Sequence, residues 1–334
     1  MSVTIKDIAK QAGVSYSTVS KALRDSPLVK KPTKTKIMKI AEELGYQPNV
    51  AARSLVQKKS FTVGVVWPSV ERVAPSILIT QINDLLEAHS YTTLLSINKI
   101  ESAISTFNRF QVDAILVFGE NENDLTNSKI QSTVPILYYG VQEDLRFPTI
   151  DVNRRLAIKL ATKYLQDIGH KQIAFIGDLS NFDPLQKDKL IGFLEAMNVE
   201  HASDLPDMII PTNGLEVHDG YLAAKNLLTK QSSITAIISG SYDLTRGILR
   251  ATTELSLKIP EDLSIISYDN IPQSENLEIQ LTTVGVPITR IAQRISETLL
   301  TIIEGETVQH SIILEPELNT LDSCAPLSNN HESS

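Results

Sequence analysis

The first apolar pattern of the chain has the spacing of a helix. Its apolar residues recur three and four positions apart and therefore share one face: Ile5, Ile8, Ala9 and Ala12. Thr4 precedes them and Asp7 follows three residues later, which predicts a capped helix start. Gly13 supplies the unconstrained backbone that a sharp turn requires. A short helix that ends in a tight turn is therefore expected.

A second short helix is expected directly after this turn, with Ser15 as its N-cap. Its buried side consists of Val19, Ala22 and Leu23. The opposite face groups hydroxyls, a phenol and cations: Tyr16, Ser17, Ser20, Lys21 and Arg24. This arrangement is typical of a helix-turn-helix, whose second helix lies in the major groove of DNA. A small helical bundle without a nucleic-acid role is the alternative that the pattern alone leaves open.

A third helix is expected over residues 33–44, with Thr33 as its cap and Gly45 as its end. A short helix signal follows over residues 49–56, capped by Asn49, and residues 57–60 are polar. A helix of fewer than about ten residues is unstable alone in water. We expect this segment to become helical only when DNA and a second copy of the chain pack against it.

From residue 61 the pattern changes to short, nearly continuous apolar runs, as in strands covered on both faces. The runs cover residues 61–67, 91–97, 112–118, 134–140, 171–178, 234–240, 263–270 and 281–287. Helical stretches between them cover residues 76–89, 154–168, 187–197, 218–230, 244–255 and 288–303. This alternation predicts parallel sheets in two doubly wound α/β lobes. Ligands of such folds bind beyond the carboxyl ends of the strands.

Composition agrees with a globular protein of two or three domains, since the chain has 334 residues of which 42% are hydrophobic. The sequence shows no signal-peptide core and no apolar run of the roughly 18 residues that a membrane helix needs. A cytoplasmic protein that does not enter membranes is therefore expected. The single cysteine, Cys324, lies in a polar segment and is expected to be a solvated thiol without a catalytic role.

Charge divides the chain into two parts of opposite sign. Residues 1–60 contain twelve Lys and Arg against four Asp and Glu, a net charge of +8. The other residues contain 19 basic and 35 acidic side chains, a net charge of −16, so the total of −8 hides the contrast. Only the first sixty residues are therefore expected to contact a polyanion such as double-stranded DNA.

Motifs for catalysis are missing from the sequence. It contains no GxGxxG after a strand, no GxxxxGK[ST], no GxSxG and no HExxH. We therefore expect no enzymatic activity, no cofactor and no metal site, and a structural role for His170. Asp269 follows a predicted strand, where it contacts a ligand or caps the next turn.

Several motifs together resemble the LacI/GalR family of bacterial transcription regulators, named for the lactose and galactose repressors. They are TIKDIAKQAGVSYSTVSKAL at 4–23, LGYQPNVAARSL at 44–55, IGHKQIAFIG at 168–177, KLIGF at 189–193 and PEDLSIISYDN at 260–270. The resemblance implies a homodimer whose all-α helix-turn-helix heads bind two half-sites of a near-palindromic operator. It also implies an α/β two-lobed, periplasmic-binding-protein-like body with an effector between its lobes.

The resemblance divides the chain into four parts. They are a head over 1–47, a hinge helix and linker over 48–60, a body over 61–320 and a polar tail over 321–334. Within the body, lobe 1 is expected over about 61–151 and 281–305, and lobe 2 over about 152–280 and 306–320.

The resemblance also assigns DNA-contacting positions. It places base-reading side chains at Tyr16, Ser17 and Lys21, and a minor-groove wedge in the hinge helix at Leu55. Phosphate-contacting positions match Thr4, Ser15, Thr18 and Thr33. With neighbouring positions, the expected DNA-binding set is Thr4, Ser15, Tyr16, Ser17, Thr18, Ser20, Lys21, Arg24, Thr33, Asn49, Ala52, Arg53 and Leu55.

The expected effector site departs from the family pattern. Lys189 stands where many members have arginine, and Tyr242 stands where many have aspartate, with Asp243 one position late. The usual clamp of arginine and aspartate on sugar hydroxyls is therefore in doubt, and an anionic effector becomes conceivable. The expected set is Trp67, Arg72, Lys189, Tyr242, Asp243 and Asp269, and the expected effector is a sugar or a sugar phosphate.

The sequence therefore predicts a dimeric, effector-controlled repressor of a carbohydrate-related operon. Activation of transcription and control by a phosphoprotein corepressor stay open as alternatives. A solute-binding protein of a transporter is disfavoured by the basic head.

Overall fold

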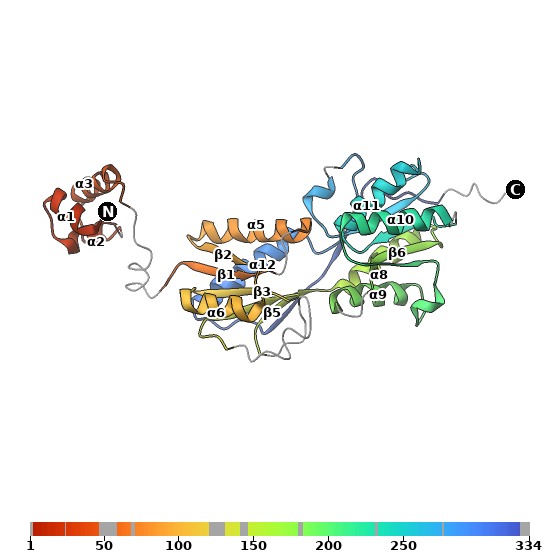
Figure 1. The fold of residues 1–334 in the computed structure, drawn as a ribbon, viewed down its shortest axis with the longest axis horizontal. Coiled ribbons are helices and arrows are strands. Elements are labelled where there is room, and N and C mark those ends of the chain that lie inside the picture. The colour runs from red at the N-terminus through yellow and green to blue at the C-terminus, as the bar shows by residue number, and fades with distance from the viewer. Residues whose placement is uncertain are drawn as a thin grey trace. The chain divides into compact units, whose positions relative to one another are not determined.

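The computed structural model describes residues 3–23, 25–46, 59–67, 71–119, 131–140, 146–179, 183–230, 233–275 and 277–327. Contacts divide the chain into two compact units, Met1–Ser60 and Phe61–Ser334 (Figure 1).

The first unit packs three helices around one small apolar core. The helices are α1 (Ile5–Ala12), α2 (Tyr16–Leu23) and α3 (Lys31–Glu43). Ile8, Val19 and Ile37, one from each helix, are fully buried at its centre. The predicted turn is confirmed, because Gly13 has a φ of 69° and follows α1 directly.

Polar groups cap the first two helices as expected. The backbone N–H and the hydroxyl of Thr4 both donate to the Asp7 carboxylate, at 2.9 and 2.7 Å. The Ser15 hydroxyl accepts the backbone N–H of Thr18 at 3.1 Å. These contacts satisfy backbone donors that a helix start leaves without intrahelical partners.

The start of α3 differs from the expectation. Lys30 is its N-cap and Pro32 lies in its first turn, so Thr33 does not cap the helix. Proline fits this position because its fixed φ is helical and its missing N–H has no intrahelical partner there. The proposed hinge helix cannot be compared in the same way, because Asn49, Ala52, Arg53 and Leu55 lie outside the described residues, as does Arg24.

The second unit contains two sheets, each with six strands among the described residues. The first sheet has the order β11-β5-β4-β3-β1-β2 and the second β12-β10-β9-β8-β6-β7. The first consists of β1 (Thr62–Val66), β2 (Thr92–Ser96), β3 (Ala114–Phe118), β4 (Ile136–Tyr139), β5 (Thr149–Val152) and β11 (Ser311–Leu314). The second consists of β6 (Ile173–Asp178), β7 (Ile209–Thr212), β8 (Ala236–Ser239), β9 (Ser264–Tyr268), β10 (Thr282–Gly285) and β12 (Glu317–Asn319).

All neighbouring strands of the first sheet pair in parallel, and in the second only β10 and β12 pair antiparallel among the strands described. Helices cover both faces of each sheet (Figure 1). The first sheet carries α5 (Val73–Ala88), α6 (Ile100–Phe110) and α12 (Ile288–Ile303). The second carries α8 (Arg154–Asp167), α9 (Pro184–Ala196), α10 (Val217–Lys230) and α11 (Tyr242–Glu254). The two-lobed parallel α/β body predicted from the strand and helix pattern is therefore confirmed.

The path of the chain between the lobes corrects the predicted lobe boundaries. β10 pairs with β9 and thus belongs to lobe 2, although residues 281–305 were expected in lobe 1. β11 pairs with β5 and belongs to lobe 1, although residues 306–320 were expected in lobe 2. Both strands have four residues, and their sequences, TTVG and SIIL, do not indicate which sheet they join, so their hydrogen-bonded neighbours decide it.

Residues 321–327 pack onto lobe 2, so the expected polar tail is wrong for this segment. The Ser323 hydroxyl is buried and donates to the Ile265 carbonyl at 2.6 Å, and the Leu327 N–H donates to the Ile168 carbonyl at 3.0 Å. Cys324 is not a solvated thiol either, because burial raises the pKa of its thiol to about 11.

His170 has the structural role that its position predicted. Its Nδ1 lies 2.8 Å from the Thr235 hydroxyl, and its Nε2 lies 3.0 Å from the Ala325 carbonyl oxygen.

Among the described residues, no helix has the length and apolar character needed to cross a membrane.

Candidate functional site

The outward face of α2 carries the side chains predicted to read DNA. Tyr16 is 55% exposed, and Ser17 and Lys21 are exposed beside it. Val19 and Ala22 face the core, because a helix that packs on one side must present the other to solvent. A phenol, a hydroxyl and an ammonium group therefore project together from one helix, as base-edge contacts require.

Hydroxyl groups gather at the start of the same helix. The Ser15 hydroxyl lies 2.8 Å from both the Ser17 and the Thr18 hydroxyls. Thr4, Ser15 and Ser17 are exposed, and Thr18, Ser20 and Thr33 are half-buried. Hydroxyls and backbone N–H groups at a helix start are suitable donors to DNA phosphates.

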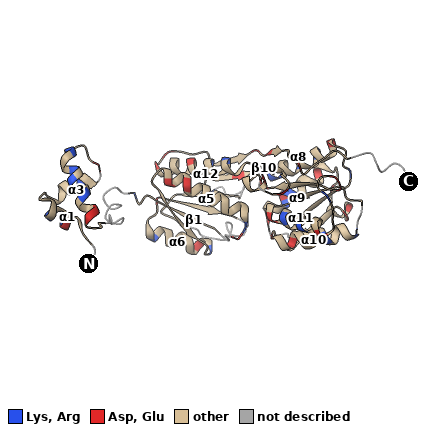
Figure 2. Ribbon diagram, turned by 90° about the horizontal axis from the view of Figure 1, so that it is seen from above, with Lys and Arg blue, Asp and Glu red and all other residues tan. Residues whose placement is uncertain are grey.

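Lysines are numerous in the first unit, and Figure 2 shows them along α3. Three of them have partners among the described residues of the unit, and one of these is Lys39, whose ammonium lies 3.9 Å from the Glu43 carboxylate. Lys36 donates to the Ala12 carbonyl at 3.1 Å, and Lys34 forms an ion pair with Asp25. Fewer than the twelve cations of residues 1–60 are therefore free of partners within the unit.

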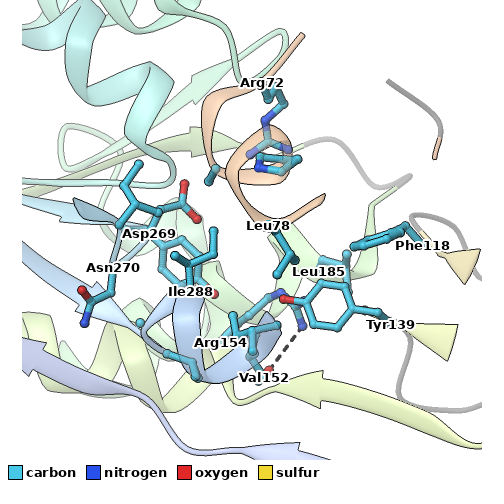
Figure 3. Close-up of a pocket in the computed structure, with 18 of the residues that line it drawn as sticks. Arg72, Leu78, Phe118, Tyr139, Val152, Arg154, Leu185, Asp269, Asn270 and Ile288 are labelled. Carbon is cyan, nitrogen blue, oxygen red and sulfur yellow. Dashed lines mark hydrogen bonds between the residues drawn. The ribbon is translucent and has the colours of Figure 1, made fainter. Parts of the chain in front are cut away.

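A pocket lies between the two lobes of the body, at the carboxyl ends of strands from both sheets (Figure 3). It encloses about 140 Å³, which is room for on the order of ten water molecules and is comparable to a monosaccharide. Lobe 1 contributes strand-end residues such as Trp67, Phe118 and Tyr139, and lobe 2 contributes Tyr268 and Asp269. The predicted position of the ligand site, beyond the strand ends, agrees with this pocket.

Arg154 is a cation in this pocket that the sequence reasoning missed. It begins α8 directly after β5 and is 6% exposed. Its Nη1 donates to the Asp151 carboxylate at 2.6 Å and to the Val152 carbonyl at 3.3 Å. Burial lowers the pKa of Arg154, but the attraction of Asp151 outweighs burial and raises it overall. The guanidinium is therefore charged and fixed in orientation.

Lys189 lines the same pocket from α9. Gly192 brings α9 close to α8, because a Cβ atom at Gly192 would lie 2.3 Å from the Arg155 carbonyl oxygen. The Lys189 ammonium donates to the Gly240 carbonyl at 2.7 Å and lies 3.8 Å from the centre of the Tyr268 ring. Burial lowers the pKa of Lys189 to about 7.

Asp269 lies at the pocket, where a ligand contact was expected, and that contact stays a prediction. It lines the pocket, and its carboxylate accepts the backbone N–H of Tyr242 at 3.0 Å, at the start of α11. Its φ is 83°, a left-handed conformation that aspartate and asparagine adopt more readily than most residues. The carboxylate is thereby held at one edge of the pocket.

Trp67 and Arg72 line the pocket from lobe 1. Trp67 is 4% exposed and packs edge-to-face on Phe118, with ring centroids 3.7 Å apart. The Trp67 Nε1 and the Arg72 Nε are buried and have no hydrogen-bond partner among the described residues. Both N–H groups are therefore donors available to a ligand.

Tyr242 and Asp243 were predicted to bind the effector, but the structure places both outside the pocket lining. Tyr242 is 5% exposed, belongs to the core, and its hydroxyl donates to the Gln273 carbonyl at 3.4 Å. The Asp243 carboxylate accepts the backbone N–H of Val73 at 3.0 Å. Since Val73 begins α5, this hydrogen bond joins the two lobes directly.

Sequence reasoning missed Arg154, Phe118 and Tyr139 as lining residues. Burial raises the pKa of Tyr139, so its phenol keeps its proton and can donate a hydrogen bond. One signal for Arg154 was present, namely a cation immediately after a short apolar segment, but no strand was predicted at 149–152.

Comparisons with known proteins agree with this architecture. Residues 4–49 match the family described as "Bacterial regulatory proteins, lacI family", and residues 162–324 match a "Periplasmic binding protein-like domain". Catabolite control protein A of Priestia megaterium is 30% identical over 323 residues, which are 95% of this chain and 97% of that protein. The probable HTH-type transcriptional repressor ExuR of Bacillus subtilis is 31% identical over 330 residues, which are 96% and 98%.

Among solved structures, the lac repressor dimer bound to operator and the anti-inducer ONPF has a TM-score of 0.79 at 23% identity. The alignment covers 97% of this chain and all of that one. A helix-turn-helix unit joined to a two-lobed body with an interlobe pocket defines the class of effector-controlled transcription regulators. Within that class, the chain belongs to the LacI family of bacterial regulatory proteins.

Proposed function

We propose that the protein is a cytoplasmic repressor of a carbohydrate-related operon, which binds a near-palindromic double-stranded DNA operator as a homodimer. The observation that carries the proposal is the outward face of α2, where Tyr16, Ser17 and Lys21 project together. A two-fold dimer places two such helices in successive major grooves, so its operator has two related half-sites.

Each predicted DNA contact has a distinct task in this proposal. Tyr16, Ser17 and Lys21 contact base edges, and the hydroxyls of Thr4, Ser15, Thr18 and Thr33 contact phosphates. Leu55 enters the minor groove, with Asn49, Ala52 and Arg53 beside it. Ser20, on α2, and Arg24, which lies outside the described residues, are proposed as further contacts to the DNA.

Control is proposed to come from a sugar or sugar phosphate that binds in the interlobe pocket. An effector changes DNA affinity only if it binds two conformations of the body with different affinities. A pocket lined from both lobes meets this condition, because its shape depends on how the lobes close. The proposal includes no catalytic step, since the relatives are transcription regulators.

The proposal is tested by selecting operator sequences from random duplex DNA and measuring their affinity by fluorescence anisotropy. Tyr16→Ala should lose about 1–3 kcal/mol of discrimination at the base pairs it contacts, while binding to unrelated DNA changes little. Met38→Ala, at a half-exposed position of α3, is the matched control and should keep full discrimination.

Removal of residues 1–60 should abolish operator binding, because the body carries a net charge of −16. Operator binding by the isolated body, or unchanged base discrimination in Tyr16→Ala, would contradict the proposal.

A further inference from the structure

Among the described residues, cations outnumber carboxylates in the lining of the interlobe pocket. Arg72, Arg154 and Lys189 are its described cations and Asp269 is its described carboxylate. Figure 3 shows Arg72, Arg154 and Asp269. Asp151 lies behind Arg154 as its ion-pair partner, and the Asp243 carboxylate is bound to the Val73 N–H outside the lining. With Lys189 protonated, the three cations exceed the Asp269 and Asp151 carboxylates by one charge, which an anionic ligand compensates and a neutral ligand does not.

The pocket lining also contains hydrogen-bond donors that have no acceptor among the described residues. The Trp67 Nε1 and the Arg72 Nε are buried donors without a described partner. Both described hydrogen bonds of Arg154 use its Nη1, so its Nη2 and Nε donors have no described acceptor. The Lys189 ammonium has three donors, of which one goes to the Gly240 carbonyl. Such a lining fits a ligand group that only accepts hydrogen bonds.

Two of the cations are held close to each other by the packing of their helices. Arg154 lies at the start of α8 and Lys189 in α9, and Gly192 allows these helices to approach closely. The charge of Arg154 acts on Lys189 and disfavours its protonated form. An anion between the two side chains converts this repulsion into two attractions, and the planar guanidinium matches the geometry of a carboxylate or phosphate.

We propose that the effector is an anionic sugar derivative, and that Arg154, Lys189 and Arg72 bind its carboxylate or phosphate group. The ring of the sugar then lies toward Trp67, Phe118 and Asp269, where an apolar face and a hydroxyl acceptor are available. The inference rests on the proposed function in taking the interlobe pocket as the effector site.

Proton uptake is an expected consequence of anion binding. Burial lowers the pKa of Lys189 to about 7, with Asp269 and Asp183 opposing and Arg72 and Arg154 reinforcing the shift. The Lys189 ammonium also faces the ring of Tyr268. A bound anion stabilises the charged ammonium and raises its pKa, so binding takes up a proton above about pH 7 and little below pH 6.

Inorganic phosphate is the first probe, because it tests the anion site without the sugar. Calorimetry on the full chain at constant ionic strength should show binding to wild type that weakens about tenfold or more in Lys189→Met. Methionine retains an apolar stem against Tyr268. Lys187→Met removes an exposed lysine from the same helix and should bind phosphate as wild type does. Equal phosphate binding to both variants overturns the proposal, and so does absence of binding to wild type by phosphate and by the uronates used below.

Matched sugars then identify the source of the anion. Glucose and galactose are compared with their uronates and their 6-phosphates, and each titration is repeated in two buffers of different ionisation enthalpy. Anionic members should bind at least tenfold more tightly than their neutral parents and take up a proton at pH 8. Preference for uronates indicates a carboxylate, and preference for phosphates a phosphate ester. A neutral sugar that binds as tightly as its anionic derivatives overturns the proposal.

Operator affinity of wild type without any sugar separates the two hypotheses. If the wild-type protein binds its operator sequence-specifically but its effector is a neutral sugar, the proposed anionic site is rejected. The proposed function as a DNA-binding regulator is then retained. Loss of sequence-specific binding rejects the proposed function, whichever sugars bind.

Discussion

The helix-turn-helix unit and the interlobe pocket present their functional groups in opposite ways. In the first, Tyr16 and Lys21 project into solvent from a helix whose other side is apolar. In the second, Arg154 and Lys189 are 6% and 3% exposed and are held by neighbouring polar groups. An exposed face is visible in the order of residues along one helix, whereas a buried site is assembled from strand ends far apart in sequence. The two regions should therefore respond differently to substitution.

The largest effect is expected where a buried charge loses its partner. Arg154→Met leaves the Asp151 carboxylate buried without its ion pair and should lower the free energy of unfolding by about 3–5 kcal/mol. The adjacent Arg155 pairs with Glu195 at a half-exposed position, so Arg155→Met should cost less than about 1 kcal/mol. Urea denaturation of the two variants measures the difference in their free energies of unfolding. Equal losses would mean that burial of the ion pair does not determine its contribution to stability.

A smaller effect is expected at the edge of the pocket. Asp269→Asn keeps the left-handed backbone and an acceptor for the Tyr242 N–H, but it removes the charge. Effector affinity should fall by about 1.5–3 kcal/mol, the usual range for a hydrogen bond to a charged group, while operator affinity without effector stays normal. Titration of the effector with and without operator checks both parts. Unchanged effector affinity would remove Asp269 from the site.

In the helix-turn-helix unit, two lysines should differ by their surroundings. Lys21→Ala removes an exposed cation from the groove, so besides weakening base discrimination it should reduce the slope of log affinity against log salt by up to about one, because the ammonium also displaces counterions. Lys36→Ala removes a hydrogen bond to the Ala12 carbonyl and should reduce stability while leaving the slope nearly unchanged. Anisotropy titrations at several salt concentrations distinguish them, and identical slopes for both variants would contradict the assignment.

The smallest effect is expected for the hydrogen bond between the lobes. Burial raises the pKa of the Asp243 carboxyl, so the folded protein holds this proton more tightly than the unfolded chain. Its contribution to stability is present below the ordinary carboxyl pKa and is lost as the pH rises through the raised pKa. Asp243→Asn should therefore gain stability relative to wild type as the pH rises above the ordinary carboxyl pKa of about 4. A gap in melting temperature that does not change with pH would reject this account.

The arrangement of strands and helices was readable from the sequence because each element buries an apolar pattern. The three helices around Ile8, Val19 and Ile37 and the two parallel α/β lobes follow from such patterns. Sheet membership of β10 and β11 was not readable, since each strand has only four residues and pairing alone assigns it to a sheet. The burial of Ser323 was hidden because its polar group is satisfied by the backbone of a distant strand.

Site residues divide in the same way. Trp67, Arg72, Lys189 and Asp269 were predicted from the strand-end position or from family motifs, and all four line the pocket. Asp243 was misplaced because a carboxylate near a strand end can equally hold a backbone N–H of the other lobe. Arg154 was overlooked because its role depends on the burial of Asp151, which no local pattern reveals.

The chain passes between the lobes three times in the described part of the body, after β5, after β10 and after β11. The pocket adjoins two of these crossings, through Val152 at the first and Gly285 and Val286 at the second. Three covalent connections limit how far the lobes can separate or slide, so we expect their relative motion to be rotation about the region of these crossings. A ligand bound in the pocket lies close to this axis of rotation. A displacement of a fraction of an ångström at the pocket is then multiplied toward the far ends of both lobes.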